Sequence, residues 1–252
     1  MDRLENLKNI IMYLMADEHV SHRIPSSLEE RQRMMRALMN VWSPRPISEA
    51  FLKMQDAELQ MQREDKGVVE VHDEGLTIWQ GDITRLKLDA IVNAANAQAL
   101  GCWAPLHNCI DNCIHSAAGI QLRKECADKM QGRLLATGDA FITKGYNLPA
   151  KHVIHTVGPI IPDGIPTKEQ EEQLAACYRG CLDLAEKNGL ESIAFCCIST
   201  GVFHFPNQRA AEIAIETVKS YPRHSLKTIV FNVFLDKDHD IYEQLLGAYP
   251  MA

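Results

Sequence analysis

The sequence predicts an α/β fold: a mixed β-sheet covered on both faces by helices and preceded by a helical extension. Two observations support this. From Gly67 onward, short β-rich runs alternate with helical ones. Residues 1–66 contain no convincing strand and space Leu, Ile, Met and Phe at helical intervals. We therefore divide the chain into a helical N-terminal extension, residues 1–66, and an α/β domain, residues 67–252.

Three helices are expected in the extension. Their apolar spacing is found in the runs LKNIIMYLM, SLEERQRMMRALMNVW and ISEAFLKMQDAELQMQRED. The second has a start signal, because Ser27 and Glu30 match a capping box just after Pro25. Its methionines are interpreted as packing residues, since Met fills irregular gaps.

Seven strands are expected after Gly67, at residues 68–71, 76–79, 89–94, 139–146, 152–157, 192–198 and 228–234. Helices are expected between and after them, at about residues 110–130, 168–188, 207–220 and 239–247. The β-rich start followed by a βαβα order indicates a mixed sheet with helices on both faces.

Composition excludes several classes of protein. The 252 residues are 46% hydrophobic and 23% charged, which is enough for a sizeable core. A net charge of −7 argues against binding nucleic acid through its phosphates. The start of the chain lacks the pattern of a signal peptide, and no apolar run approaches the roughly 18 residues that span a bilayer. We expect a soluble, cytoplasmic protein whose eight cysteines are reduced thiols, metal ligands or core residues.

An apolar strand ends near two asparagines, Asn93 and Asn96. In open α/β sheets, ligands gather at the carboxyl ends of strands, where two carboxamides can hold sugar hydroxyls. Alternatively, both side chains cap a turn by hydrogen bonding to the backbone. The residue types alone leave both interpretations open.

The strongest chemical signal is the C-x4-H-x-C spacing of Cys102, His107 and Cys109. Thiolates and imidazole suit zinc, and three protein ligands leave one tetrahedral position for water or substrate, as in catalytic sites. Cys113 lies one helical turn past Cys109 and is an alternative fourth ligand of a structural site. A third interpretation, with buried thiols and a surface histidine, also stays open.

Asp111 begins the helix that follows this cluster. Its carboxylate can orient water or hold a ligand hydroxyl, or it can simply stabilise the helix N-terminus. We expect a packing or surface role for His115. His152 and His155 share a strand with no other ligand type around them, and we assign them no site.

A second candidate ligand-binding segment follows the strand at residues 192–198. Small residues with exposed backbone N–H groups beside a helix N-terminus can bind phosphate without Lys or Arg. These residues are Ser199, Thr200, Gly201, Val202 and Phe203. In GDIT, Asp82 is either a turn residue or an acceptor for an adenine amino group.

Four motifs in order, GDIT, IVNAAN, D-x-x-IH-x-AAG and IST-G-V-F, resemble the macrodomain family over roughly residues 68 to 250. The resemblance implies a three-layer macrodomain. Common members carry a run of glycines between the second Asn and the catalytic Asp, where this chain has ALGCWAPLHNCI. That departure resembles the zinc-dependent macrodomains of bacteria and fungi, which also carry a helical N-terminal extension.

The resemblance also implies roles for individual residues. Asp82 and Ile83 would contact adenine, Asn96, Ile110 and Asp111 would lie at the distal ribose, and residues 199–203 would hold the diphosphate and distal ribose. One Zn²⁺ per chain would be held by Cys102, His107 and Cys109, with Cys113 as a neighbouring thiol.

The activity implied by the resemblance is hydrolysis of mono-ADP-ribose from a modified protein side chain, at the anomeric carbon of the distal ribose. Asn96 and Asp111 would be catalytic, and zinc would act as a Lewis acid or lower the pKa of a bound water. The alternative is an ADP-ribose-binding module with a structural zinc. Relatives are often associated with a sirtuin-like ADP-ribosyltransferase and a lipoyl-carrier protein, and we expect neither a nucleic-acid nor a membrane partner.

Overall fold

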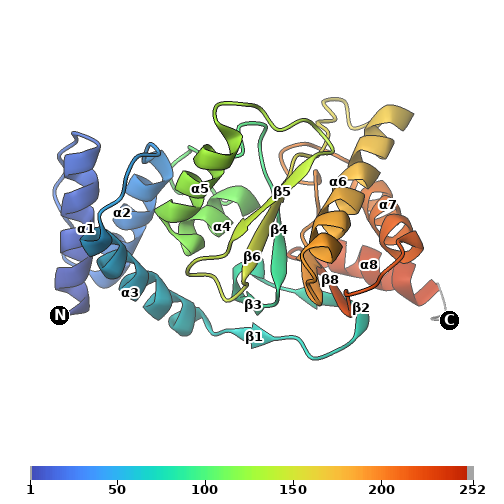
Figure 1. Ribbon diagram of the computed structural model, residues 1–252, viewed down its shortest axis with the longest axis horizontal. Helices are drawn as coiled ribbons and strands as arrows, with labels where there is room; N and C mark the ends of the chain where they lie inside the picture. Colours follow the sequence, from blue (N-terminus) through green and yellow to red (C-terminus); the bar gives the residue numbers. More distant parts are fainter. Residues whose placement is uncertain (1, 249–252) are drawn as a thin grey trace.

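A six-stranded sheet crosses the middle of the computed structural model, which describes residues 2–248 (Figure 1). Its strands lie in the order β2-β8-β7-β4-β6-β5. They are β2 (Gly75–Gln80), β4 (Ala90–Ala94), β5 (Ala140–Lys144), β6 (His152–Thr156), β7 (Ser192–Phe195) and β8 (Thr228–Val233). All neighbours are parallel except β5 and β6, so the predicted mixed sheet is confirmed. A separate parallel pair joins β1 (Val69–Glu70) to β3 (Leu86–Lys87).

Helices cover both faces of this sheet, as predicted (Figure 1). On one face lie α4 (Ile110–Ala118) and α5 (Ile120–Met130). On the other lie α6 (Lys168–Lys187), α7 (Asn207–Ser220) and α8 (Asp236–Ala248), the last beginning three residues before the predicted start. None of the helices within residues 2–248 combines the length and the apolar character needed to cross a membrane.

The single helix predicted over residues 110–130 is wrong, because Gly119 divides it into α4 and α5. Gly119 has φ +103°, a conformation that side chains rarely adopt. A Cβ there would lie 2.4 Å from Oε1 of Gln121 and 2.7 Å from Nε2 of Gln55. The helical periodicity continues across the break, which is why the sequence pattern did not reveal it.

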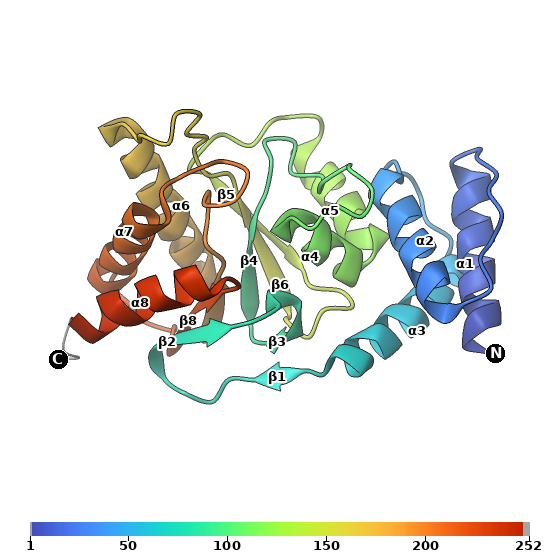
Figure 2. The ribbon, with the colours of Figure 1, turned by 180° about the vertical axis from the view of Figure 1, so that it is seen from behind.

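Three helices form the N-terminal segment, in agreement with the sequence: α1 (Arg3–Asp17), α2 (Leu28–Val41) and α3 (Glu49–Lys66). Ser27 caps α2, since its Oγ accepts from the Glu30 N–H at 3.3 Å, but the Glu30 carboxylate accepts from Ser27 Oγ at 2.7 Å and the reciprocal bond of the predicted capping box is not formed. These helices share an apolar cluster that includes Leu7, Phe51 and Ile120 of α5. Figure 2 shows α2 between α1 and the α4–α5 pair, so the segment packs on the helices that cover the sheet.

Three loops lie at the same end of the sheet, where the parallel strands have their carboxyl ends. A 3-10 helix, η1 (Ile83–Arg85), follows β2, residues 95–109 follow β4, and residues 196–206 follow β7. Because these strands run in the same direction, their carboxyl ends lie at the same end of the sheet. The candidate site residues lie in these loops or at the start of α4, except for Asn93, which lies in β4.

Candidate active site

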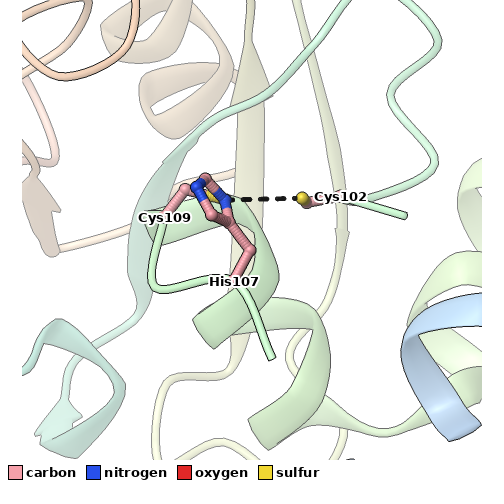
Figure 3. Close-up of side chains that lie close together, drawn as sticks. All are labelled: Cys102, His107 and Cys109. Carbon is pink, nitrogen blue, oxygen red and sulfur yellow. Dashed lines mark hydrogen bonds between the residues drawn. The ribbon is translucent and has the colours of Figure 1, made fainter. Parts of the chain in front are cut away.

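Cys102, His107 and Cys109 are brought together in the loop between β4 and α4. Figure 3 shows their side chains converging from both sides of the loop. Cys102 Sγ lies 3.7 Å from His107 Nδ1, and one donor atom from each residue falls within 4.8 Å of the others. Two sulfurs and an imidazole at this spacing suit a tetrahedral zinc ion, whose ligands lie about 2.0–2.3 Å away. The donor set therefore fits a metal with three protein ligands.

Cys113 stands apart from this group. Its Sγ accepts from Arg36 Nη2 at 3.8 Å, and its side chain lines a cavity of about 150 Å³ between the N-terminal helices and α4. Within residues 2–248, the candidate metal ligands at this loop are Cys102, His107 and Cys109 alone.

Asn96 caps a turn, as one of its two interpretations predicted. Its Oδ1 accepts from the N–H groups of Gln98 and Ala99, at 3.0 and 3.2 Å, and so caps the turn that opens the loop. Its Nδ2 donates to Gly101 O at 3.1 Å and lies 3.4 Å from Asp111 Oδ2. The turn thus fixes the carboxamide beside Asp111.

Asp111 is buried at the first turn of α4. Its Oδ1 accepts from Asn93 Nδ2 at 2.7 Å. Burial raises the pKa of Asp111 to about 6, while the hydrogen bond from Asn93 and the charge of Arg123 act in the opposite direction. The carboxylate is therefore contacted by two asparagines, Asn93 at Oδ1 and Asn96 at Oδ2.

His155 belongs to this site, although the sequence gave no reason to assign it one. Its Nδ1 lies 3.1 Å from Asn93 Nδ2, and its Nε2 lies 3.0 Å from Thr143 Oγ1. Burial lowers the pKa of His155 to about 3, so the ring is neutral. His152 is three residues away and so lies on the opposite face of β6.

The signal for His155 is the register of the sheet, in which it pairs with Asn93. His115 is buried as well, with Nε2 3.5 Å from Asp111 Oδ1, so its role is not a surface one. Burial and the neighbouring His155 and Arg123 hold its pKa well below the usual range. Gly101 lies against this ring, because a Cβ there would come within 2.8 Å of His115 Cγ.

The loop after β7 contains the second candidate ligand-binding segment, residues 199–203. Ser199 adopts a left-handed conformation with φ 66°, and its buried Oγ has no hydrogen-bond partner within the described residues. Phe203 O accepts from the Ile161 N–H at 2.8 Å, and Ser199 O accepts from the Phe205 N–H at 3.0 Å. These bonds hold the loop in a tight turn, while Gly201 and Val202 at its tip are exposed and Thr200 is half-buried.

Asp82 forms a turn at the end of β2, as one of its two interpretations predicted. Its Oδ1 accepts from the N–H and the hydroxyl of Thr84, at 3.0 and 2.6 Å, and its Oδ2 accepts from Lys66 Nζ at 3.1 Å. Burial acts to raise the pKa of Asp82, but the Thr84 hydrogen bonds and the Lys66 charge outweigh it and the pKa is lowered. Ile83 beside it is buried, and Ile110 at the start of α4 is half-buried.

Comparison with known proteins identifies the family. The model of the macro domain family matches residues 92–214, from β4 into α7. A protein-ADP-ribose hydrolase of Staphylococcus aureus is 46% identical over 259 residues, which cover 97% of each chain. The chain belongs to the macro domain family. The matched region of this macro domain protein contains Cys102, His107 and Cys109, together with Asp111 and residues 199–203.

Two further proteins extend the comparison. A probable bifunctional ADP-ribose hydrolase/ADP-ribosyltransferase of Fusarium oxysporum f. sp. cubense is 45% identical over 196 residues, which cover 73% of this macro domain protein and 32% of the fungal one. The crystal structure of a Trypanosoma brucei macrodomain in complex with ADP-ribose superposes with a TM-score of 0.64 at 31% identity, covering 84% of this chain and 95% of that one.

Proposed function

We propose that this macro domain protein is a zinc-dependent hydrolase that removes mono-ADP-ribose from modified protein side chains, cleaving at the anomeric carbon of the distal ribose. The observation that carries the proposal is the position of Cys102, His107 and Cys109, in the loop that leads from Asn96 to Asp111. The name of the staphylococcal relative supports the hydrolase activity. In this proposal, residues 1–66 are an N-terminal extension and residues 67–252 form the macrodomain.

ADP-ribose would lie along the loops at the carboxyl edge of the sheet. Asp82 and Ile83 would contact adenine, and residues 199–203 would hold the diphosphate and the distal ribose. Each carboxylate oxygen has two lone pairs, so Asp82 can accept from an adenine amino group while it keeps its bond to Lys66. The tight turn at Ser199 supports a phosphate-binding role, because it places small residues before the N-terminus of α7.

The chemistry would be performed next to the metal loop, which we define as residues 102–109. When bound there, Zn²⁺ supplies a Lewis acid for an oxygen of the substrate or lowers the pKa of a water to about 7. Asp111, held in place by its hydrogen bond from Asn93, would accept a proton from the water as the water oxygen bonds to the anomeric carbon. The bond from that carbon to the protein side chain would break, and the departing side-chain atom would take up the proton. Asn96 would orient the hydroxyls of the distal ribose, since its turn fixes the carboxamide beside Asp111.

A binding module with a structural zinc is the alternative function. A fourth protein ligand would favour it, because structural zinc sites are closed. Cys113 was the candidate, and its hydrogen bond with Arg36 instead supports an open site.

The decisive experiment measures bound zinc and the release of ADP-ribose from a mono-ADP-ribosylated protein. Cys102→Ala should lose both the zinc and the activity, whereas the matched control Cys113→Ala should keep one zinc per chain and remain active. Equal activity of metal-free and zinc-loaded protein would refute the zinc mechanism. Loss of zinc in Cys113→Ala would instead favour the binding module.

We further propose that the modified protein is a lipoyl-carrier protein, ADP-ribosylated by a sirtuin-like transferase. The name of the fungal relative supports a link between such a hydrolase and a transferase. Rates of ADP-ribose release from a modified lipoyl carrier and from an unrelated mono-ADP-ribosylated protein would test this. Equal rates would count against a dedicated carrier substrate.

A further inference from the structure

The backbone of the metal loop is held by side chains from outside it. Arg36 Nη2 donates to His107 O at 2.8 Å, and Asn40 Oδ1 accepts from the Leu106 N–H at 2.9 Å. Both side chains belong to α2. From the other side, Asn112 Nδ2 of α4 donates to Ala104 O at 2.9 Å and Arg123 Nη2 of α5 donates to Cys102 O at 3.3 Å. These bonds are distributed from Cys102 to His107, the first two candidate ligands of the loop.

Arg36 also fixes the third ligand, through Asn112. Its Nε and Nη2 both donate to Asn112 Oδ1, at 3.2 and 2.9 Å. The N–H of Asn112 in turn donates to Cys109 Sγ at 3.4 Å. One arginine of α2 is therefore connected to His107 directly and to Cys109 through one residue.

Asn40 stabilises the most strained part of the loop. Leu106 has φ 60°, which is uncommon for a residue with a branched side chain, and Asn40 satisfies its N–H. Asn40 itself is buried, and its Nδ2 donates to Ser116 Oγ at 3.0 Å. Ser116 Oγ donates to Asn112 Oδ1 at 3.2 Å, so both α2 side chains belong to one hydrogen-bond network.

Arg123 joins the end of α2 to the start of the loop. Its Nη1 donates to the carbonyls of Met39, Asn40 and Trp42, at 3.2, 2.8 and 2.9 Å. These carbonyls lie at the end of α2, where backbone acceptors outnumber donors; Met39 O also accepts from the Trp42 N–H at 3.4 Å. The same guanidinium lies 4.1 Å from the centre of the Trp103 ring.

We propose that α2 is a positioning element of the metal site, in which Arg36 and Asn40 hold the metal loop in the conformation that binds the ion. The inference rests on the proposed function for the identity of the metal. Its physical basis is preorganisation: a loop that is already ordered loses less entropy when its ligands close on a metal. Groups that orient metal ligands typically change metal affinity about 10–100-fold when removed. The N-terminal helices would thus be part of the hydrolytic site rather than only a cover for apolar surface.

The test compares Arg36→Met with Arg33→Met. Methionine keeps the aliphatic packing of the side chain and removes its donors. Arg33 lies three residues earlier on α2, is exposed, and forms no hydrogen bond or ion pair within the described residues. We expect zinc affinity, measured by competition with a chromophoric chelator, to fall about 10–100-fold in Arg36→Met and to stay unchanged in Arg33→Met.

ADP affinity is the control for folding, because ADP lacks the distal ribose that would lie at the metal loop. It should be unchanged in both variants. Unchanged zinc affinity in an Arg36→Met protein that binds ADP normally would overturn the inference. If Arg36→Met loses ADP binding, Arg36→Lys is the variant to test, because lysine keeps the positive charge but lacks the several N–H donors of the guanidinium. We expect Arg36→Lys to bind zinc more weakly than the wild type. Wild-type zinc affinity in Arg36→Lys would overturn the inference. Absence of zinc binding in the wild type would instead refute the proposed function.

Discussion

Asp111 is the residue on which the proposed chemistry depends most directly. It is buried between Asn93, Asn96 and His115, at 2.7, 3.4 and 3.5 Å, and these contacts fix the direction of its two oxygens. None of the three neighbours carries a positive charge to pair with it, because the pKa of His115 is held well below its usual range by burial. The carboxylate is thus ordered by polar contacts and has no cationic partner among these three neighbours.

Replacement of Asp111 by Asn tests this role. The substitution keeps the shape of the side chain but removes the proton acceptor, so single-turnover release of ADP-ribose should fall about 10²–10⁴-fold. Zinc content and ADP-ribose affinity should stay close to those of the wild type, which separates loss of chemistry from loss of the site. Full single-turnover activity with zinc bound would show that Asp111 is not the base.

The residues of this site differ in how far the sequence could reveal them. Cys102, His107 and Cys109 lie within eight positions, so their spacing alone predicts a shared site. His155 is 62 residues from Asn93, and Arg36 is 76 residues from Asn112. Such pairs depend on strand register and on the packing of α2 against α4, which no local pattern encodes.

At the scale of elements, sequence patterns predicted the main strands and most helices. The central strands β4, β7 and β8 are buried on both faces and form continuous apolar runs, whereas the helices bury one apolar face. The β1–β3 pair was not predicted in full, because β3 has only two residues and depends on its partner. The division of residues 110–130 depends on the conformation of Gly119, and a glycine inside a helical pattern does not by itself indicate a break.

The Gly119 junction gives a testable prediction. Gly119→Ala should lower the free energy of unfolding by about 1–3 kcal/mol, because alanine is strained at φ +103° and its Cβ would displace Gln121 and Gln55. Gly247→Ala is the matched control, since Gly247 lies in α8 with open space around it and alanine favours helices. Urea unfolding of both variants measures the difference. Equal stability of Gly119→Ala and the wild type would contradict the strain argument.

Glu186 connects the end of α6 to the segment before β8. Its carboxylate accepts from the N–H groups of His224, Ser225 and Leu226 and from the Ser225 hydroxyl, at 2.8 to 3.2 Å. Burial acts to raise its pKa, but these hydrogen bonds outweigh burial and lower the pKa from 4.5 to about 2. A carboxyl with a lowered folded-state pKa stabilises the fold above its unfolded pKa and loses that contribution as pH falls.

Glu186→Gln should therefore destabilise the protein near neutral pH, with a smaller effect in acid. The difference in unfolding free energy between wild type and variant should be full above about pH 4.5 and shrink as the pH approaches about 2. Urea unfolding across this range measures it. A difference that stays constant with pH would show that the ionised carboxylate is not the source of the stability.

At the scale of the molecule, the metal loop lies between the macrodomain helix α4 and helix α2 of the N-terminal segment. It follows β4 of the central sheet, precedes α4 and is hydrogen-bonded to α2 of the N-terminal segment. None of the residues of this loop is fully buried, so its order depends on polar contacts and, in the proposed function, on the metal. A ligand that binds the folded state alone stabilises it according to its concentration relative to its Kd.

Zinc should therefore raise the thermal stability of the whole chain. Free zinc at 100 times its Kd contributes about 2.7 kcal/mol to the free energy of unfolding, so a chelator should lower the Tm of the wild type. Cys102→Ala should melt at the same temperature with and without chelator, because it lacks a ligand. Cys113→Ala should respond like the wild type, since its thiol faces Arg36 instead of the metal group. Scanning calorimetry of protein with measured zinc content checks this. If the chelator leaves the Tm of the wild type unchanged, the loop is ordered by Arg36, Asn40 and Arg123 alone.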